Sequence, residues 1–261
     1  MIRRAVSSVG AGATYAVTYV GGLVTLFIQT IGWLFRPFAK HRLVVGHMLH
    51  IGVKTLPVSG VILFLIGVVI AFQTAYQVRA LGGEVLIPAL LAVSIARELG
   101  PVMTALVVAG RVGAAITAEI GTMAVTEQID AIDAMAVPPV KFLVVPRLIA
   151  MAIVAPILTI YTDLVGLLGG YVACVGKLGL TSGFYFDKAF SALAMSDVMS
   201  GLWKSFIFSV LICIVSCYEG MRVQGGAQGV GQATMRSVVV SFILIVVADF
   251  FFTLFFYLLP L

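Results

Sequence analysis

Residues 126–139 read TEQIDAIDAMAVPP, a polar stretch set between long apolar segments. As a helix over about 126–137 with Thr126 as its N-cap, it places Ile129, Ile132 and Ala136 on one face. The paired prolines at 138–139 end that helix. About three turns of acidic, amphipathic helix are too short for a domain but suit a groove on another protein. The stretch therefore predicts a cytosolic coupling helix.

Composition indicates that the rest of the chain lies in a membrane. The 261 residues are 61% hydrophobic and 10% charged, and the mean hydropathy is +1.15. A soluble protein of this composition would have too little polar surface to cover its uncharged runs. A bilayer, in contrast, accommodates each run of about 20 apolar residues as one helix. The predicted fold class is an all-α integral membrane protein.

Five segments are apolar and long enough to cross a bilayer, namely residues 57–78, 85–122, 148–176, 198–218 and 237–261. Residues 5–35 are apolar but diluted by glycine, and a basic cluster follows at 36–42. We expect an interfacial, elbow-type helix there, with a sixth span as the alternative. The chain then divides into an N-terminal interfacial helix with a basic cytosolic connection, residues 1–50, and a transmembrane domain, residues 51–261.

The basic residues orient the predicted spans. The net charge is +5, and the first six basic residues all precede Pro57. With the N-terminus and residues 126–139 in the cytosol, ten basic residues lie inside, and three lie outside: Arg79, Lys177 and Lys188. The asymmetry is typical of positive-inside topology, and the spread of charge argues against nucleic acid as a partner.

Motifs for nucleotide binding are incomplete. Residues 170–177 (GYVACVGK) resemble a phosphate loop, but five residues separate the glycines and Leu178 replaces the Ser or Thr that binds magnesium. The glycine-rich residues 225–231 lack the dinucleotide-binding spacing and read as a flexible cytosolic loop. The sequence also has no compact nucleophile motif, so we expect a non-catalytic chain that binds no cofactor of its own.

Metal and disulfide chemistry are not predicted either. His47 and His50 are three residues apart but have no third ligand near them, and a closed site needs four. Cys174, Cys213 and Cys217 all fall in apolar segments and are expected to be buried thiols.

Ionisable residues inside the predicted spans are functional candidates, because an unpaired charge there costs several kcal/mol. Arg97 and Glu98 are the sharpest pair, and salt bridges that hold the bundle together are the competing interpretation. The same ambiguity applies to Glu119, Asp163, Lys204, Glu219 and Asp249. For Lys204 and Asp249 the structural interpretation is favoured.

One continuous block of motifs comprises 97–101 (RELGP), 109–115 (AGRVGAA), 118–123 (AEIGTM), 126–131 (TEQIDA) and 135–137 (MAV). This block resembles the signature of the MlaE (YrbE) permease family. Further matches are 146–147 (PR), 229–234 (GVGQAT) and 236–239 (RSVV). The resemblance runs from about residue 57 to the C-terminus, whereas residues 1–50 match only as a weakly apolar helix with a basic end.

The resemblance implies a homodimeric permease of the bacterial inner membrane. Each protomer would have an N-terminal interfacial helix and five spans, and would dock one cytosolic ABC ATPase, where ATP and magnesium bind. A hexameric ring of Mce-domain (MlaD-like) lipid-binding subunits would cap the outer face, and a small STAS-domain (MlaB-like) subunit is a further implied partner. The implied cargo is phospholipid, moved between inner and outer membranes in support of outer-membrane lipid asymmetry.

Two sets of site residues follow. The ATPase-coupling set is Glu127, Gln128, Ile129, Asp130, Ile132, Asp133 and Met135. The lipid-binding set, chosen for polarity at membrane depth and expected at the dimer interface, is Phe72, Gln73, Tyr76, Arg97 and Glu98.

Two other functional classes stay open. An ion- or proton-coupled secondary transporter would use Arg97, Glu98, Asp163 and Asp249 as a relay without ATP. A non-transporting membrane scaffold would only anchor peripheral proteins through residues 126–139. Dependence of transport on a partner ATPase would indicate the ABC permease, and dependence on a proton gradient would indicate the secondary transporter. The scaffold predicts no internal lipid.

Overall fold

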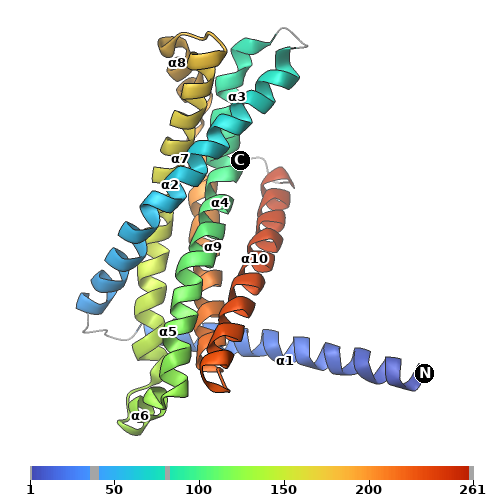
Figure 1. Ribbon diagram of the computed structural model, residues 1–261, viewed down its shortest axis with the longest axis vertical. Coiled ribbons are helices and arrows are strands. Elements are labelled where there is room, and N and C mark those ends of the chain that lie inside the picture. The colour runs from blue at the N-terminus through green and yellow to red at the C-terminus, as the bar shows by residue number, and fades with distance from the viewer. Residues whose placement is uncertain (1, 36–40, 80–82, 259–261) are drawn as a thin grey trace.

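The computed structural model describes residues 2–35, 41–79 and 83–258, and the secondary structure in these ranges is helical (Figure 1). The α-helices are α1 (Ile2–Leu34), α2 (His41–Arg79), α3 (Ile87–Ser94), α4 (Gly100–Val108), α5 (Ala114–Val125), α6 (Gln128–Ala134), α7 (Val145–Lys177), α8 (Ser182–Ala192), α9 (Met195–Met221) and α10 (Gly226–Leu258). A 3₁₀ turn, η1 (Glu84–Leu86), and three π-helical segments, η2 (Ile95–Leu99), η3 (Ala109–Gly113) and η4 (Val140–Val144), complete the list.

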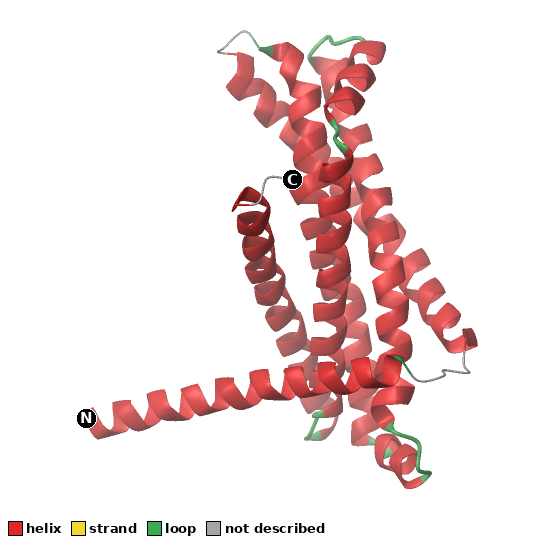
Figure 2. Ribbon diagram, turned by 180° about the vertical axis from the view of Figure 1, so that it is seen from behind, coloured by secondary structure: helices red, strands yellow, loops and turns green. Residues whose placement is uncertain are grey.

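Six stretches in the described part of the chain are long and apolar enough to cross a membrane. They are Val17–Leu34, His41–Val78, Ile87–Val125, Val140–Lys177, Met195–Met221 and Gly226–Phe256. The last five run roughly along the length of the bundle, whereas α1 extends across it near the end that carries α6 (Figures 1 and 2). The all-α membrane fold is thus confirmed, and α1 has the orientation expected of an interfacial helix.

Several predicted boundaries were wrong because hydropathy marks only the part of a helix that lies in hydrocarbon. The first predicted span began at Pro57, but α2 begins at His41 and contains Pro57. The third began at Leu148, but its helix begins at η4. Residues 225–231, predicted as a flexible loop, are mostly the first turns of α10, and only Gly225 and Gly226 there have positive φ.

One helix was not predicted. Helix α8 lies at the end of the bundle opposite α6 and packs against α3 (Figure 1). Its Tyr185 is fully buried, and the hydroxyl donates a hydrogen bond of 2.8 Å to the carbonyl oxygen of Leu167. Burial raises the pKa of this phenol. We call this end of the molecule the α8 end, and the opposite end the α6 end.

Close contact between α2 and α7 depends on small residues. A Cβ added at Gly67 would overlap the carbonyl oxygen of Gly166, and one at Gly169 would overlap that of Phe64. The small-residue face predicted around Gly166 therefore brings the two backbones together. This contact holds α2 and α7 together as a pair. The segment η2, with the charged residues of the second long span, is placed against that pair.

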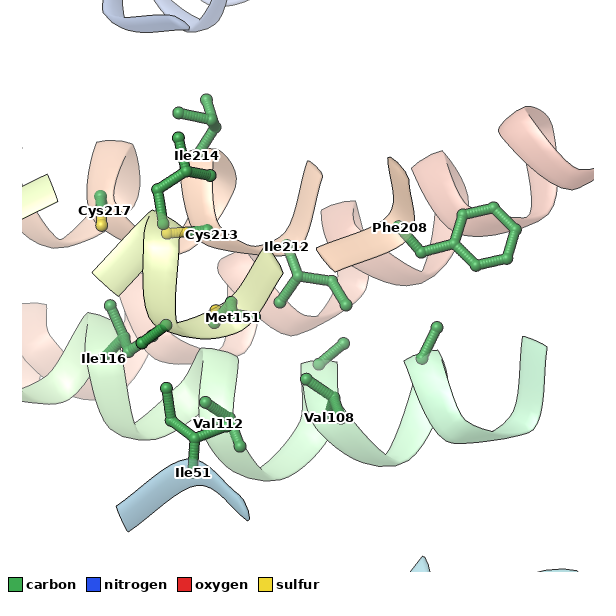
Figure 3. Packing of buried hydrophobic residues seen from close by; sticks show 14 of the residues in the cluster. Ile51, Val108, Val112, Ile116, Met151, Phe208, Ile212, Cys213, Ile214 and Cys217 are labelled. Atoms are coloured by element: carbon green, nitrogen blue, oxygen red, sulfur yellow. The ribbon is translucent and has the colours of Figure 1, made fainter. Parts of the chain in front are cut away.

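The larger hydrophobic core lies where α2, α4, η3, α5, α7 and α9 meet (Figure 3). Ile51, Val112, Met151 and Ile212 converge there from four different elements. Cys213 belongs to the same cluster, and all three cysteines are buried and free, as predicted. A second cluster near the α8 end joins α2, α3, α7 and α8.

Candidate functional site

The second long span is interrupted by a π turn at its charged pair. The backbone N–H of Gly100 bonds the carbonyl oxygen of Ile95, five residues earlier, rather than four as in an α-helix. This segment, η2, carries Arg97 and Glu98 and separates α3 from α4. Turns of this kind occur frequently at functional sites. The widened turn gives Arg97 and Glu98 different partners.

Glu98 belongs to an intramembrane charge cluster with Lys204, Asp249 and Thr253. The Lys204 ammonium donates to Glu98 Oε2 at 2.5 Å, to Asp249 Oδ1 at 2.8 Å and to the Thr253 hydroxyl at 3.0 Å. Lys204 is 1% exposed, while the side chains of Glu98 and Asp249 are 35% and 25% exposed. The cluster thus ties η2 to α9 and α10 and leaves part of two carboxylates accessible on the surface of the chain.

Arg97 has a different partner, which sequence reasoning missed. Its Nε lies 3.2 Å from Oδ1 of Asp197 near the start of α9, and Asp197 Oδ2 also accepts a hydrogen bond from the backbone N–H of Ala194. The Asp197 side chain is nearly buried, and that of Arg97 is about half exposed. An acidic residue three positions after a helix N-cap was the available sequence signal.

The other proposed lipid-binding residues lie on α2. Phe72, Gln73 and Tyr76 are all exposed, and Tyr76 is 86% exposed. Within the described ranges, no hydrogen bond or ion pair connects them with Arg97 or Glu98. The structure therefore places Phe72, Gln73 and Tyr76 on α2, and the charged Arg97 and Glu98 on η2.

Two further glutamates singled out in the sequence are paired near the α6 end. Glu119 lies 2.8 Å from Nη2 of buried Arg147, which joins α5 to α7. Glu219 accepts a hydrogen bond of 2.7 Å from the Tyr19 hydroxyl and lies 3.5 Å from Nε of Arg236. Both carboxylates thus link separate helices.

Asp163 differs from the other acidic residues of the spans. Its Oδ1 is buried and has no hydrogen-bond partner among the described residues. The adjacent Thr162 hydroxyl lies 2.7 Å from that of Thr104, so α4 and α7 are joined beside the carboxyl but not through it.

A helix is present where the coupling helix was predicted, but it is shorter than expected. Helix α6 covers Gln128–Ala134, and Thr126 is not its N-cap, because its hydroxyl donates to the carbonyl oxygen of Thr122 in the last turn of α5. Glu127 occupies the N-cap position with a left-handed backbone (φ 60°). The helix ends before the prolines, at a turn in which Ala136 is also left-handed (φ 57°). Two sharp backbone turns therefore set α6 apart from its neighbours.

The faces of α6 differ as predicted for Ile129 and Ile132, whereas Ala136, predicted on the same face, lies beyond the end of the helix and is exposed. Ile129 is partly buried and packs against the larger core, and Ile132 is also partly covered. The remaining coupling candidates are exposed, namely Glu127, Gln128, Asp130, Asp133 and Met135. An apolar residue thus anchors α6 to the bundle while an acidic surface faces away from it.

Polar contacts connect the neighbourhood of α6 to several spans. The Thr117 hydroxyl lies 2.9 Å from that of Ser237, which joins α5 to α10. On the other side, the Lys141 ammonium in η4 lies 5.3 Å from the centre of the Trp33 ring at the end of α1. The segments on either side of α6 thus contact α10 and α1.

The histidines form no larger ligand cluster. Among the residues that the structure describes, no group of three or more His, Cys, Asp or Glu side chains is arranged to hold a metal ion. His47 and His50 lie beside Arg111, whose Nη1 donates to the Thr55 hydroxyl at 2.7 Å.

Comparison with known proteins relates this geometry to transporters. The model of the family described as "Permease MlaE" matches residues 44–255. A probable ABC transporter permease protein of Rickettsia conorii is 39% identical over 253 residues, which cover 97% of this chain and 98% of that protein. A probable ABC transporter permease protein of Synechocystis is 38% identical over 201 residues, covering 77% and 76%. The chloroplastic protein TRIGALACTOSYLDIACYLGLYCEROL 1 of Arabidopsis thaliana is 36% identical over 206 residues, covering 79% of this chain and 59% of that protein.

Proposed function

This chain belongs to the MlaE permease family, and from that premise we propose that it moves phospholipids or related lipids as the membrane subunit of an ABC transporter. The observation that carries the proposal is the family match across residues 44–255, which includes the charge cluster, α6 and five spans. The lipid class is supported by the plant relative, whose name is that of a galactolipid.

The exposed parts of the charge cluster suit a lipid headgroup. Glu98 and Asp249 are partly accessible at membrane depth, where contact with hydrocarbon costs several kcal/mol. That cost is avoided when a second copy of the chain or a polar headgroup covers them. We therefore place the lipid site at the interface of a homodimer, with Phe72 and Tyr76 beside the acyl chains and Gln73, Arg97 and Glu98 toward the headgroup.

Energy would enter through α6. An ATPase that closes on ATP and magnesium would displace the acidic face of α6, and Ile129 would carry that displacement into the core. The Glu119–Arg147 ion pair and the Thr117–Ser237 hydrogen bond would distribute it to α7 and α10. Because Asp249 lies on α10 and Glu98 on the span that continues into α5, the motion reaches both carboxylates of the charge cluster.

The remaining partners follow the same proposal. We propose residence in the bacterial inner membrane with α6 in the cytosol, a ring of Mce-domain subunits at the α8 end, and a STAS-domain subunit beside the ATPase. In this assembly the chain itself performs no catalysis and binds no cofactor, and ATP is hydrolysed by the partner.

The test is ATP-dependent lipid transfer in proteoliposomes that contain the tagged protein together with the ATPase and the Mce-domain protein that copurify with it. Fluorescent phospholipid should reach the Mce-domain partner only with ATP, and bound phospholipid should appear in mass spectra of the purified complex. Combined alanine substitution of Gln73, Tyr76 and Arg97 should lower both signals. Transfer that survives an inactive ATPase and stops when a proton gradient is dissipated would instead establish an ion-coupled transporter.

A further inference from the structure

A polar cavity lies at the α6 end, where α1 crosses α9 and α10. Its volume is about 280 Å³, and its lining includes Thr18, Tyr218, Glu219, Arg222 and Arg236. A water molecule takes up about 30 Å³ in the liquid, so the space exceeds what one or two bridging waters need. It is also remote from the charge cluster, because the 15 residues from Lys204 to Glu219 on α9 correspond to about 22 Å of helix.

The cavity carries a surplus of positive charge. Two arginines and one glutamate line it, which gives a formal charge of +1. Glu219 is buried and already receives the Tyr19 hydrogen bond at 2.7 Å as well as Nε of Arg236 at 3.5 Å. The side chain of Arg236 is 57% exposed, so its remaining guanidinium nitrogens are open to a second acceptor. The acidic group is thus satisfied, and basic groups stay accessible.

The second arginine is held in place by an aromatic ring. The guanidinium of Arg222 lies 5.0 Å from the centre of the Tyr218 ring and donates to the Tyr218 hydroxyl. The same ring meets Tyr19 of α1 edge-on, with 5.3 Å between ring centres. A stacked, pre-positioned guanidinium loses little conformational freedom when it binds a planar or tetrahedral oxyanion.

We propose that this cavity binds the phosphoryl group of a membrane phospholipid in the leaflet that contacts α1, as a site separate from the transport pathway. Arginine forks match phosphate oxygens in geometry as well as in charge. The lipid origin is favoured because Thr18 lines the cavity from the apolar stretch Val17–Leu34 of α1, whose outer face exposes Val17, Val20 and Val24, so this part of α1 is suited to lie in lipid. A lipid held there would fix α1 against α9 and α10.

Adjacent glycines on α1 supply a matched test of the architecture. A Cβ at Gly22 would overlap the Tyr218 hydroxyl, whereas a Cβ at Gly21 meets nothing within 4 Å. Gly22→Ala should therefore displace Tyr218 and Arg222, and Gly21→Ala should not. Both substitutions add the same methyl group to the same helix.

The experiment measures protection of a cysteine placed in the cavity of the purified full-length protein. The native cysteines are buried, so Thr18→Cys supplies an accessible thiol whose labelling by a water-soluble maleimide can be timed. The probes are dihexanoyl phosphatidylglycerol, inorganic phosphate and dihexanoylglycerol. With the phospholipid at about four times its Kd, labelling should slow about fivefold. A cysteine at Ser191, at the α8 end, should show no protection.

The variants decide the outcome. Arg222→Gln with Arg236→Gln should raise the Kd for the phospholipid about tenfold or more, because charge-assisted hydrogen bonds are lost. At the same phospholipid concentration, labelling should then slow only about 1.4-fold or less. Lys177→Gln, which removes an exposed charge at the α8 end, should leave it unchanged. Equal protection by dihexanoylglycerol, or full protection in the double arginine variant, would overturn the proposal. Protection by inorganic phosphate but not by the phospholipid would overturn the lipid assignment in favour of a soluble anion.

A second measurement does not depend on the introduced cysteine. Native mass spectrometry of the protein without the introduced cysteine counts bound phosphatidylglycerol directly. The double arginine variant should retain one lipid fewer per protomer than Lys177→Gln. Equal lipid counts would contradict the site, and loss of transport-pathway lipid is detected separately in the combined Gln73, Tyr76 and Arg97 variant.

Discussion

Nη2 of Arg147 on α7 lies 2.8 Å from Oε1 of Glu119 on α5, so one ion pair joins the two spans on either side of α6. The pair is asymmetric, because the Arg147 side chain is 4% exposed and that of Glu119 is 57% exposed. Removal of the exposed partner therefore leaves a buried cation without its carboxylate.

We expect Glu119→Gln to lower the free energy of unfolding by about 1–3 kcal/mol, the usual cost of an unsatisfied buried group. Thermal unfolding of the detergent-solubilised protein, followed by tryptophan fluorescence, measures the change. Adding Arg147→Met should recover most of the loss. If the double variant were less stable than Glu119→Gln alone, the asymmetry argument would be wrong.

Lys204 forms ion pairs with two carboxylates in the charge cluster. Lys204→Met should leave Glu98 and Asp249 together without a cation and lower stability by about 3 kcal/mol, the lower end of the range for breaking a buried pair, since both acids are partly exposed. Adding Glu98→Gln and Asp249→Asn should restore the unfolding temperature. Persistent instability of the triple variant would assign the effect to lost packing of the lysine stem instead.

Asp163 and Asp197 should respond differently to the same change. Asp163→Asn removes a carboxyl whose Oδ1 has no described hydrogen-bond partner, so the unfolding temperature should stay the same or rise. Asp197→Asn weakens the contact to Arg97 and the helix N-terminus, and should lower stability by about 1–2 kcal/mol. Thermal unfolding of the two variants, measured in parallel, checks that Asp197→Asn has the lower unfolding temperature. A proton-relay role for Asp163 predicts instead that Asp163→Asn abolishes transport.

The two faces of α6 can be separated by mutation. Asp130→Asn with Asp133→Asn should weaken ATPase binding about threefold at low salt without changing thermal stability, because both side chains are exposed. Ile129→Asp should lower stability as well, since Ile129 packs against the core. Copurification of the ATPase and thermal unfolding are measured on the same samples. If the variant with Asp130→Asn and Asp133→Asn bound the ATPase as tightly as the unsubstituted protein, the acidic face of α6 would not be part of the docking surface.

The contact between α2 and α7 predicts a position-specific cost for one methyl group. Gly67→Ala should destabilise by about 1–3 kcal/mol through overpacking against the Gly166 carbonyl. Gly176→Ala on α7 meets nothing within 4 Å and should be neutral or slightly stabilising, because alanine favours helix. Comparison of the two unfolding temperatures tests the difference. Equal unfolding temperatures would show that α2 and α7 can move apart without loss of stability.

Sequence patterns predicted those parts of the structure that depend on local hydropathy. The spans around Arg97, Asp163, Lys204 and Asp249 were placed correctly because long apolar runs in a bilayer have few alternatives to helix. The ends of several helices were not placed correctly, because residues such as His41 in α2 and Gly226 in α10 continue a helix beyond its apolar part. Helix α8 was missed since it is short and is stabilised by a tertiary contact, that of Tyr185 with Leu167.

The partners of the charged residues required the fold. Sequence favoured a structural role for Lys204 and Asp249, and their mutual ion pair agrees with that interpretation. The contact of Lys204 with Glu98 joins residues 106 positions apart, which no local pattern shows. The pairing of Arg97 with Asp197 is of the same kind. Thr126 was misassigned because a threonine before an acidic stretch fits both a helix start and the end of the preceding helix.

The π turns also determine how the second long span should be compared between relatives. Each π turn closes its hydrogen bond over five residues, so η2 and η3 each advance the helix phase by about one residue, or about 100°. Loss of a single residue within η2, with return of that turn to α-helix, would keep the same side chains of α3 and α4 facing the bundle. A one-residue gap in an alignment at this point would therefore mark the absence of the π turn, rather than a different set of side chains facing the bundle.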